Sequence, residues 1–173
     1  MYLWRYFEGG QLSRDMTVYI DEKGTAYHIT SSQENLTLLV CELTDDYLGY
    51  TGKYNMIAPG GQNEAPCIFK HDGRYWLICS GCTGWAPNEA RMFTSKSIWG
   101  PWEQRPTPFT GEGADKTFGG QGTYVMNMNG RLIFMADIWN PRHLSQSLHL
   151  WLPIDFDTNG TPVIPWRDEY LKH

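Results

Sequence analysis

The sequence predicts an all-β fold that forms part of a β-propeller, and composition, turn chemistry and an internal repeat support this prediction. The chain has 173 residues and contains 8 Trp, 10 Tyr and 7 Phe, together with 18 Gly and 10 Pro. Aromatic residues favour strands and Gly and Pro favour turns, so this composition is typical of short strands joined by many turns. Helical periodicity is not sustained over three turns anywhere, although residues 33–39 could form a short helix on local grounds.

One repeated unit organises the chain. It consists of an apolar stretch, a polar turn that ends on Gly, and a second apolar stretch, and its three copies occupy residues 18–30, 67–79 and 124–136. Each copy predicts a β-hairpin, and the last two have Asp-Gly or Asn-Gly turn chemistry. A third strand is predicted after each hairpin, at residues 36–43, 90–96 and 148–154.

The spacing of the repeat predicts propeller blades. Its turn glycines, Gly24, Gly73 and Gly130, are 49 and 57 residues apart, which is typical of blades of three or four strands. We therefore expect residues 1–173 to form one incomplete propeller domain of about three blades. The expected blades are about 13–48, 62–105 and 118–168, and TPVIPW, from Thr161, is expected to form an outer strand of the last blade.

The repeat also brings three polar residues into one register. Asp15, Glu64 and Gln121 each stand nine residues before a turn glycine. If each begins the innermost strand of its blade, the three side chains point to the axis from one end. The loops that return to this end carry amide, hydroxyl and flat aromatic groups suited to a sugar, namely Glu34, Asn35, Thr83, Trp85, Asn88, Asp137, Trp139, Asn140 and Arg142.

Each of these groups also has an ordinary structural interpretation. A single Asp or Glu at the start of a strand is more often solvated or caps a turn, and it is the shared register that favours a site. The spacing of Cys79 and Cys82 suggests metal chemistry, but no second pair or histidine set accompanies it, so free thiols and no metal or cofactor are expected.

Six strings in the chain resemble glycoside hydrolase family 43, and within it the branch of exo-β-1,3-galactanases. The resemblance covers residues 13–166 in the correct order, and the strings are SRDMT, NEAPCIF, SGCTGWAPN, SIWGPW, FGGQGTYV and FMADIWNP. It implies a five-bladed propeller and an inverting, exo-acting hydrolase of β-linked galactosyl, or arabinosyl or xylosyl, glycans.

The resemblance also implies roles for particular residues. Glu64 matches the general acid, Asp15 matches the aspartate that modulates that acid, and Gln121 matches a glutamine on the base side. Asn35 and Thr83 match polar groups that line the sugar subsite. Since a neutral carboxamide does not ordinarily accept a proton, Asp137 and Glu34 are kept as alternative bases. Trp85 and Trp139 are expected to stack on a sugar ring.

The chain is shorter than the roughly five blades that the resemblance implies. An open arc would expose sheet edges and apolar flanks, so we expect copies of the chain to associate into a homo-oligomer that completes a ring. The alternatives to an active hydrolase are an inactive carbohydrate-binding or self-assembling propeller fragment, or a gene fragment without a role.

Charge and hydropathy limit the other partners. The formal net charge is -5 without a basic block, so neither nucleic acid nor an anionic membrane is expected as a partner. No apolar run reaches the length of a membrane span, and residues 1–10 do not have the layout of a secretory signal. As written, the sequence favours the cytoplasm, although full-length members of the resembled family are often exported.

Overall fold

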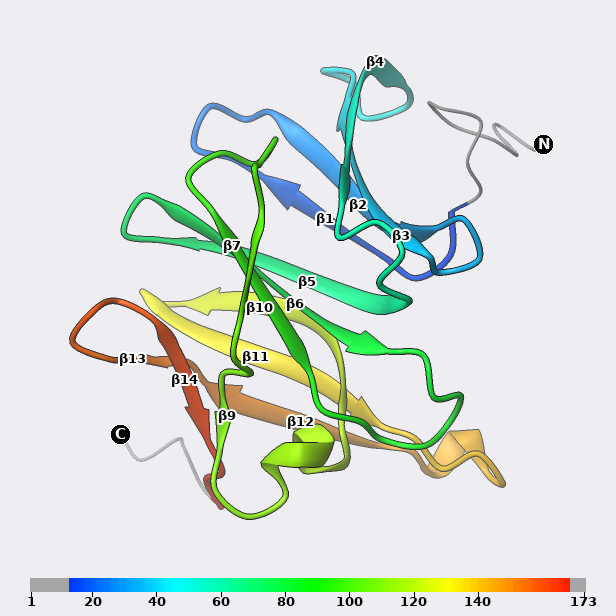
Figure 1. Cartoon of the computed structure of the whole chain (residues 1–173), viewed down its shortest axis with the longest axis vertical. Helices are drawn as coiled ribbons and strands as arrows, with labels where there is room; N and C mark the ends of the chain where they lie inside the picture. The colour runs from blue at the N-terminus through cyan, green and yellow to red at the C-terminus, as the bar shows by residue number, and fades with distance from the viewer. Residues whose placement is uncertain (1–12, 169–173) are drawn as a thin grey trace.

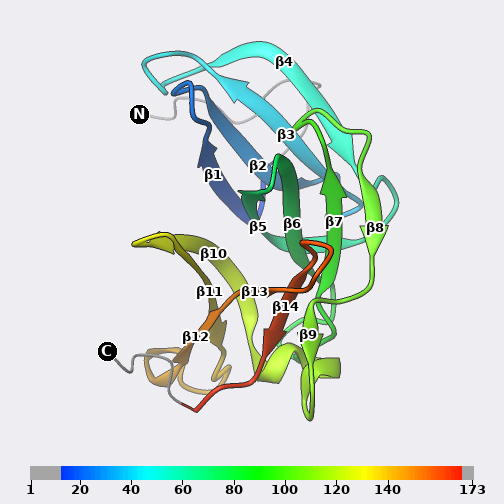
Figure 2. The same cartoon turned by 90° about the vertical axis from the view of Figure 1, so that its left-hand side faces the viewer.

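The computed structural model describes residues 13–168, which are folded mainly into β-strands. Three antiparallel sheets follow one another in the sequence and lie along an arc (Figure 1, Figure 2). The first strand of the middle sheet lies beside the first strands of both neighbouring sheets, as in adjacent propeller blades. The predicted all-β fold, a partial propeller, is confirmed.

The three predicted hairpins and their third strands are all present. The first sheet contains β1 (Met16–Ile20), β2 (Ala26–Ser32), β3 (Thr37–Leu43) and β4 (Tyr50–Ile57). The second contains β5 (Asn63–His71), β6 (Arg74–Gly81), β7 (Arg91–Ser95) and β8 (Glu103–Arg105). The third contains β10 (Gln121–Met128), β11 (Arg131–Ile138) and β12 (Leu148–Pro153). Two short 3₁₀ helices, η2 (Ala114–Gly119) and η3 (Leu144–Gln146), lie in the connections.

The strand predicted at the outer edge of the last blade lies elsewhere, so that prediction is wrong. It is β14 (Pro162–Pro165), which pairs with β13 (Asp155–Phe156) and runs parallel to β9 (Phe109–Thr110) in a small fourth sheet. Prolines cannot donate to a ladder, which limits pairing at both ends of β14. Ile164 of β14 pairs instead with Phe109 of β9, and both side chains are buried in the same apolar cluster.

Residues 33–39 do not form a helix. Gln33, Glu34 and Asn35 have φ angles of 51°, 55° and 66°, in the left-handed region, and β3 begins at Thr37. This tight turn joins β2 to β3 and brings Asn35 to the start of the second sheet, where the Asn35 carbonyl accepts a hydrogen bond from the Asn63 N–H at 2.8 Å.

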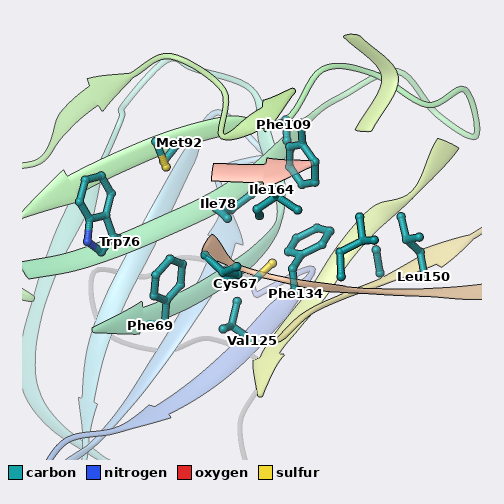
Figure 3. Packing of buried hydrophobic residues seen from close by; sticks show 14 residues of the cluster. Cys67, Phe69, Trp76, Ile78, Met92, Phe109, Val125, Phe134, Leu150 and Ile164 are labelled. Carbon is teal, nitrogen blue, oxygen red and sulfur yellow. The ribbon is translucent and has the colours of Figure 1, made fainter. Parts of the chain in front are cut away.

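Two apolar clusters hold the sheets together. One lies between the first and second sheets and includes Ile29, Val40 and Leu77. The other joins the second and third sheets to β9 and β14, and Figure 3 shows its members, among them Cys67 and Phe134, packed between the ribbons. Side chains alternate between the two faces of a strand. One face of the first sheet and one face of the third sheet therefore pack against the middle sheet.

Gly122 allows the second and third sheets to approach closely. A Cβ atom at this position would lie 2.6 Å from the Cys67 sulfur and 3.0 Å from the Phe134 ring, so no larger residue fits without movement. Gly122 directly follows Gln121, and this packing therefore fixes the start of β10 against the start of the second sheet.

Candidate active site

The three residues that share a register begin neighbouring strands at one rim of the arc. Asp15 immediately precedes β1, Glu64 is the second residue of β5, and Gln121 is the first residue of β10. A cavity of about 200 Å³ at this rim is lined by residues that include Asp15, Ala65, Gln121 and Trp139. The structure therefore brings the predicted residues together at the same end of the inner strands.

The Glu64 carboxylate is held from the first sheet by Asn35. The Asn35 side-chain nitrogen donates to Glu64 Oε1 at 2.5 Å. Asn35 is only 6% exposed, and its Oδ1 is buried without a hydrogen-bond partner. Asn35, the predicted sugar-subsite residue, thus contacts Glu64, the predicted acid, and its Oδ1 can still accept a hydrogen bond.

Asp15 acts on the backbone next to Glu64. Its Oδ2 accepts a hydrogen bond from the Ala65 N–H at 3.2 Å. Ala65 has a φ of 50°, and the register between β5 and β6 shifts between Glu64 and Cys67, which marks a β-bulge. A non-glycine residue in this conformation is strained, and such strain persists only where the surroundings hold it. Asp15 provides one such restraint.

Gln121 is fixed at both ends of its carboxamide. Its nitrogen donates to Ser80 Oγ at 3.0 Å, and its oxygen accepts from the Trp139 indole N–H at 2.9 Å. The Ser80 hydroxyl in turn lies 3.5 Å from the Glu64 carbonyl oxygen, at the limit of a hydrogen bond. Ser80 of the second sheet thereby connects the backbone of Glu64 to the side chain of Gln121 in the third sheet.

The aromatic residues form a pair beside Gln121. Trp85 and Trp139 have ring centroids 5.6 Å apart and an interplanar angle of 72°. They are 55% and 38% exposed, so part of each ring is available to a ligand. Thr83 is occupied within its own loop, because its hydroxyl donates to the Ala86 carbonyl at 2.5 Å and accepts from Asn88 at 2.7 Å.

The two alternative bases are engaged in other contacts. Glu34 forms an exposed ion pair with Arg14 at 2.8 Å. Asp137 contacts the His149 ring at 2.8 Å, and neither carboxylate lines the cavity that contains Gln121. The structure does not bring Glu34 or Asp137 into that cavity.

Three further residues lie near Glu64 or Gln121 and were not predicted as site residues from the sequence. Arg91 donates to the Gly61 carbonyl and to Asn63 Oδ1, at 2.8 Å for the latter, and so anchors the segment before Glu64. Ser80 connects to Gln121. Burial raises the pKa of the Cys82 thiol, and the nearby Glu64 charge adds to this shift. Ser80 and Cys82 lie in the SGCTGWAPN string, whereas Arg91 gave no signal.

Some features are absent from the described residues. Within residues 13–168, no group of three or more His, Cys, Asp or Glu side chains is placed to hold a metal ion. The four cysteines are free thiols. In the same part of the chain, no helix has the length and apolar character required to cross a membrane.

A propeller rim that holds carboxylates, carboxamides and exposed tryptophans offers the polar and flat apolar groups that a sugar site uses. Residues 3–160 match the glycosyl hydrolases family 43. The chain belongs to glycoside hydrolase family 43.

Solved structures of this family resemble the chain closely. A family 43 β-1,3-galactosidase, solved with galactodeoxynojirimycin, is 56% identical with a TM-score of 0.91, and the match covers 93% of this chain and 47% of that one. An exo-β-1,3-galactanase from Clostridium thermocellum is 33% identical with a TM-score of 0.81, over 91% and 35%. An exo-β-1,3-galactanase from Phanerochaete chrysosporium, solved with galactose, is 33% identical with a TM-score of 0.82, over 91% and 36%. The chain thus spans about half of the first structure and about a third of the others.

Proposed function

We propose that this chain carries the acid side of the active site of an inverting, exo-acting glycoside hydrolase that cleaves β-linked galactosyl glycans. The observation that carries the proposal is the set of hydrogen bonds between sheets that holds Glu64, Asn35, Asp15 and Gln121 at one rim. The 56% identity to a β-1,3-galactosidase supports a galactosyl substrate over an arabinosyl or xylosyl one.

Glu64 is the proton donor in this proposal. Asn35 occupies Oε1, which leaves Oε2 to carry the proton and deliver it to the glycosidic oxygen as the bond to the anomeric carbon breaks. Asp15 is a positioning residue, because its hydrogen bond to the Ala65 N–H fixes the backbone beside Glu64.

Gln121 positions the attacking water. Its contacts with Ser80 and Trp139 fix the direction of the carboxamide, and one oxygen lone pair and one N–H remain for a water molecule or a sugar hydroxyl. An inverting mechanism needs room for this water, with the acid and the water-holding group roughly 6.5–9.5 Å apart. Trp85 and Trp139 contact the sugar ring, and Thr83 is a more distant subsite residue whose loop would have to open.

Glu64→Gln tests the acid assignment. The parent and the variant are incubated with β-1,3-galacto-oligosaccharides and with aryl β-galactosides, arabinosides and xylosides, and the anomer released is followed by NMR. We expect Glu64→Gln to lower galactan hydrolysis by roughly 100- to 10,000-fold, the usual contribution of a general acid. The control is Glu112→Gln, at an exposed loop position, which should leave the rate unchanged.

A carbohydrate-binding module without turnover is the second candidate function. It is favoured because the match covers only 47% of the β-1,3-galactosidase, and the unmatched part of that protein can contribute to its pocket. Calorimetry with the same oligosaccharides separates the two functions. Binding that Trp85→Ala weakens, without hydrolysis of any glycan by the parent, would favour the binding module. Hydrolysis that survives Glu64→Gln would remove Glu64 as the donor.

A further inference from the structure

The segment that leads into β10 has an unfavourable backbone conformation. Thr117 and Phe118 of η2 have φ angles of 50° and 55°, and Gly119 follows at 84°, so three successive residues lie in the left-handed region. This region suits Gly119, but it is unfavourable for a β-branched Thr and for a bulky Phe. Figure 1 shows this short helix where the chain enters the third sheet, just before Gln121. Such strain is typical of functional sites and persists only where the surroundings hold it.

The Thr117 hydroxyl connects this segment to the loop between β6 and β7. Its Oγ1 accepts a hydrogen bond from the Ala90 N–H at 2.9 Å and donates one to the Asn88 carbonyl at 2.8 Å. Thr117 is only 2% exposed, and a buried hydroxyl without partners would be costly. Asn88 and Ala90 both precede β7, so the hydroxyl satisfies two backbone groups that lie outside the strands.

Asn88 closes the loop that Thr117 holds. The Asn88 side chain accepts a hydrogen bond from the Gly81 N–H at 2.9 Å and donates to the Gly81 carbonyl at 3.0 Å. It also donates to the Thr83 hydroxyl at 2.7 Å. Its side chain therefore joins the two ends of the loop, while its backbone carbonyl is bound to Thr117. Trp85 lies between these ends, so the loop that carries Trp85 is held at its base by Thr117.

The contacts return to Gln121 through two tryptophans. Trp85 packs edge-on against Trp139, and the Trp139 indole N–H donates to the Gln121 oxygen at 2.9 Å. Thr117 is therefore linked to Gln121 in two ways, through the backbone that enters β10 and through the loop of Trp85. A cavity of about 20 Å³ is lined by residues that include Asn88, Gln121 and Trp139. It has room for about one water molecule, so it is not itself a sugar subsite.

We propose that Thr117 is a positioning residue for Gln121, whose hydroxyl holds the Trp85 loop and the start of β10 so that Gln121 meets Trp139. The left-handed conformation is kept at Thr117 because its release would break both hydrogen bonds of a buried group. The inference rests on the proposed role of Gln121 in holding the attacking water. The contact between Gln121 and Trp139 can nevertheless be measured whether or not the chain hydrolyses a glycan.

Thr117→Val tests the proposal, because it removes the hydroxyl and nearly keeps the volume of the side chain. The measurement is the Trp139 indole N–H resonance in a ¹H–¹⁵N spectrum of the full chain, assigned with Trp139→Phe. We expect Thr117→Val to shift this resonance upfield as the bond to Gln121 weakens, and Thr117→Ser, which keeps a hydroxyl, to leave it in place. In hydrolysis of β-1,3-galacto-oligosaccharides, Thr117→Val should lower kcat by roughly 10- to 100-fold with a smaller change in KM, as expected for a small misplacement near the reacting groups.

Thr107→Val is the matched control. Thr107 Oγ1 is also buried but has no hydrogen-bond partner, so the same substitution breaks no bond and should change neither the resonance nor kcat. If Thr117→Val does not fold, hydrogen exchange of the Ala90 amide in the parent is the second measurement. This amide precedes β7 and should exchange slowly because Thr117 binds it.

Several results would overturn the role of Thr117. They are an unshifted indole resonance in Thr117→Val, an equal shift in Thr117→Ser or Thr107→Val, and rapid exchange of the Ala90 amide. An upfield shift in Thr117→Val alone, in a chain that hydrolyses no glycan, would support Thr117 as the positioning residue and count against the proposed hydrolase. The two proposals therefore fail on different measurements.

Discussion

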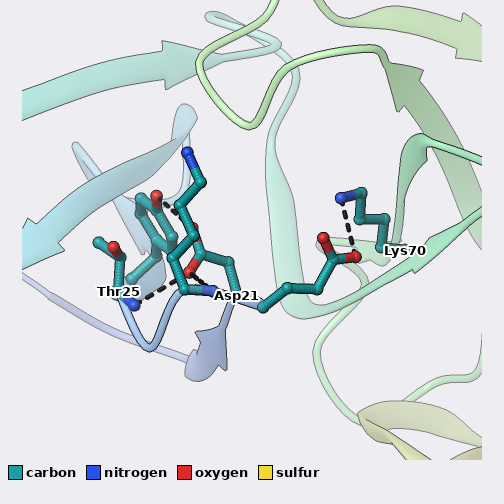
Figure 4. A network of polar contacts seen from close by, with 6 residues as sticks. Asp21, Thr25 and Lys70 are labelled. Carbon is teal, nitrogen blue, oxygen red and sulfur yellow. Dashed lines mark hydrogen bonds and ion pairs between the residues drawn. The ribbon is translucent and has the colours of Figure 1, made fainter.

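The polar residues at the two ends of the inner strands differ in where their hydrogen-bond partners lie. At the rim where β1, β5 and β10 begin, side chains bond from one sheet to the next, as Asn35 does to Glu64 and Gln121 does to Ser80. At the far rim, the hairpin turns are held by bonds within themselves, and an exposed contact between sheets joins Lys70 to Glu22. Asp21 accepts hydrogen bonds from the N–H groups of Lys23 and Thr25, as Figure 4 shows for the Asp21 and Thr25 contact.

This difference separates the rim that carries the proposed site from the rim that is held by local turns. The far-rim turns are satisfied by neighbours in the sequence, and Asn127, which accepts from the Gly130 N–H at 2.8 Å, repeats the pattern of Asp21. Such turns need no other sheet. The rim that carries Glu64 also uses partners that are 29, 41 and 50 residues away in the chain, so its geometry exists only when the sheets are packed.

Arg91→Ala should produce the largest structural effect, because it removes a long-range support of the rim that carries Glu64. The Arg91 guanidinium holds the Gly61 carbonyl and the Asn63 amide, and Asn63 is completely buried. Hydrogen bonds to charged groups contribute about 1.5–3 kcal/mol, so we expect the free energy of unfolding in urea to fall by roughly 2–3 kcal/mol. Glycan hydrolysis or binding should weaken with it, since Glu64 follows Asn63.

Arg131→Ala is the control at the far rim. Arg131 is exposed at the start of β11, and its substitution should change the free energy of unfolding by less than roughly 0.5 kcal/mol. If Arg91→Ala and Arg131→Ala lowered the free energy of unfolding equally, the inferred difference between the two rims would be wrong.

The same contrast explains which parts could be predicted from the sequence. The hairpins follow from local turn chemistry and alternation, and the shared register of Asp15, Glu64 and Gln121 follows from the repeat. β14 was misplaced because its parallel partner, β9, has only two residues and is far away in the chain. Arg91 carries no local signal, because its role depends on the loop that it reaches.

Asp21→Ala should have a smaller effect, confined to stability. It removes the two turn hydrogen bonds and a third from the Tyr27 hydroxyl at 3.1 Å, so we expect a loss of roughly 1–2 kcal/mol in the free energy of unfolding. Sugar binding and hydrolysis should be unchanged, because Asp21 lies at the opposite end of β1 from Asp15. A parallel loss of activity would contradict the separation of the rims.

The pH dependence of the Asp21→Ala effect has a definite sign. Partial burial pushes the pKa of Asp21 up, but hydrogen bonds from Lys23, Thr25 and Tyr27 outweigh it and hold the pKa below its ordinary value. A carboxyl with a lower pKa in the folded state stabilises the fold above its unfolded pKa, and this contribution is lost as the pH falls through the folded value. The difference between parent and variant should therefore narrow below about pH 4.

Lys70→Met should have the smallest effect, although it breaks a contact between sheets at the far rim. The Lys70 ammonium lies 3.0 Å from Glu22, but the Glu22 side chain is 78% exposed, and exposed ion pairs contribute little because water and salt screen them. Methionine keeps the stem that packs near Tyr75. We expect a small decrease in the urea midpoint at low salt that disappears near about 1 M salt. A loss as large as that of Arg91→Ala, and insensitive to salt, would mean that contacts between sheets stabilise both rims equally.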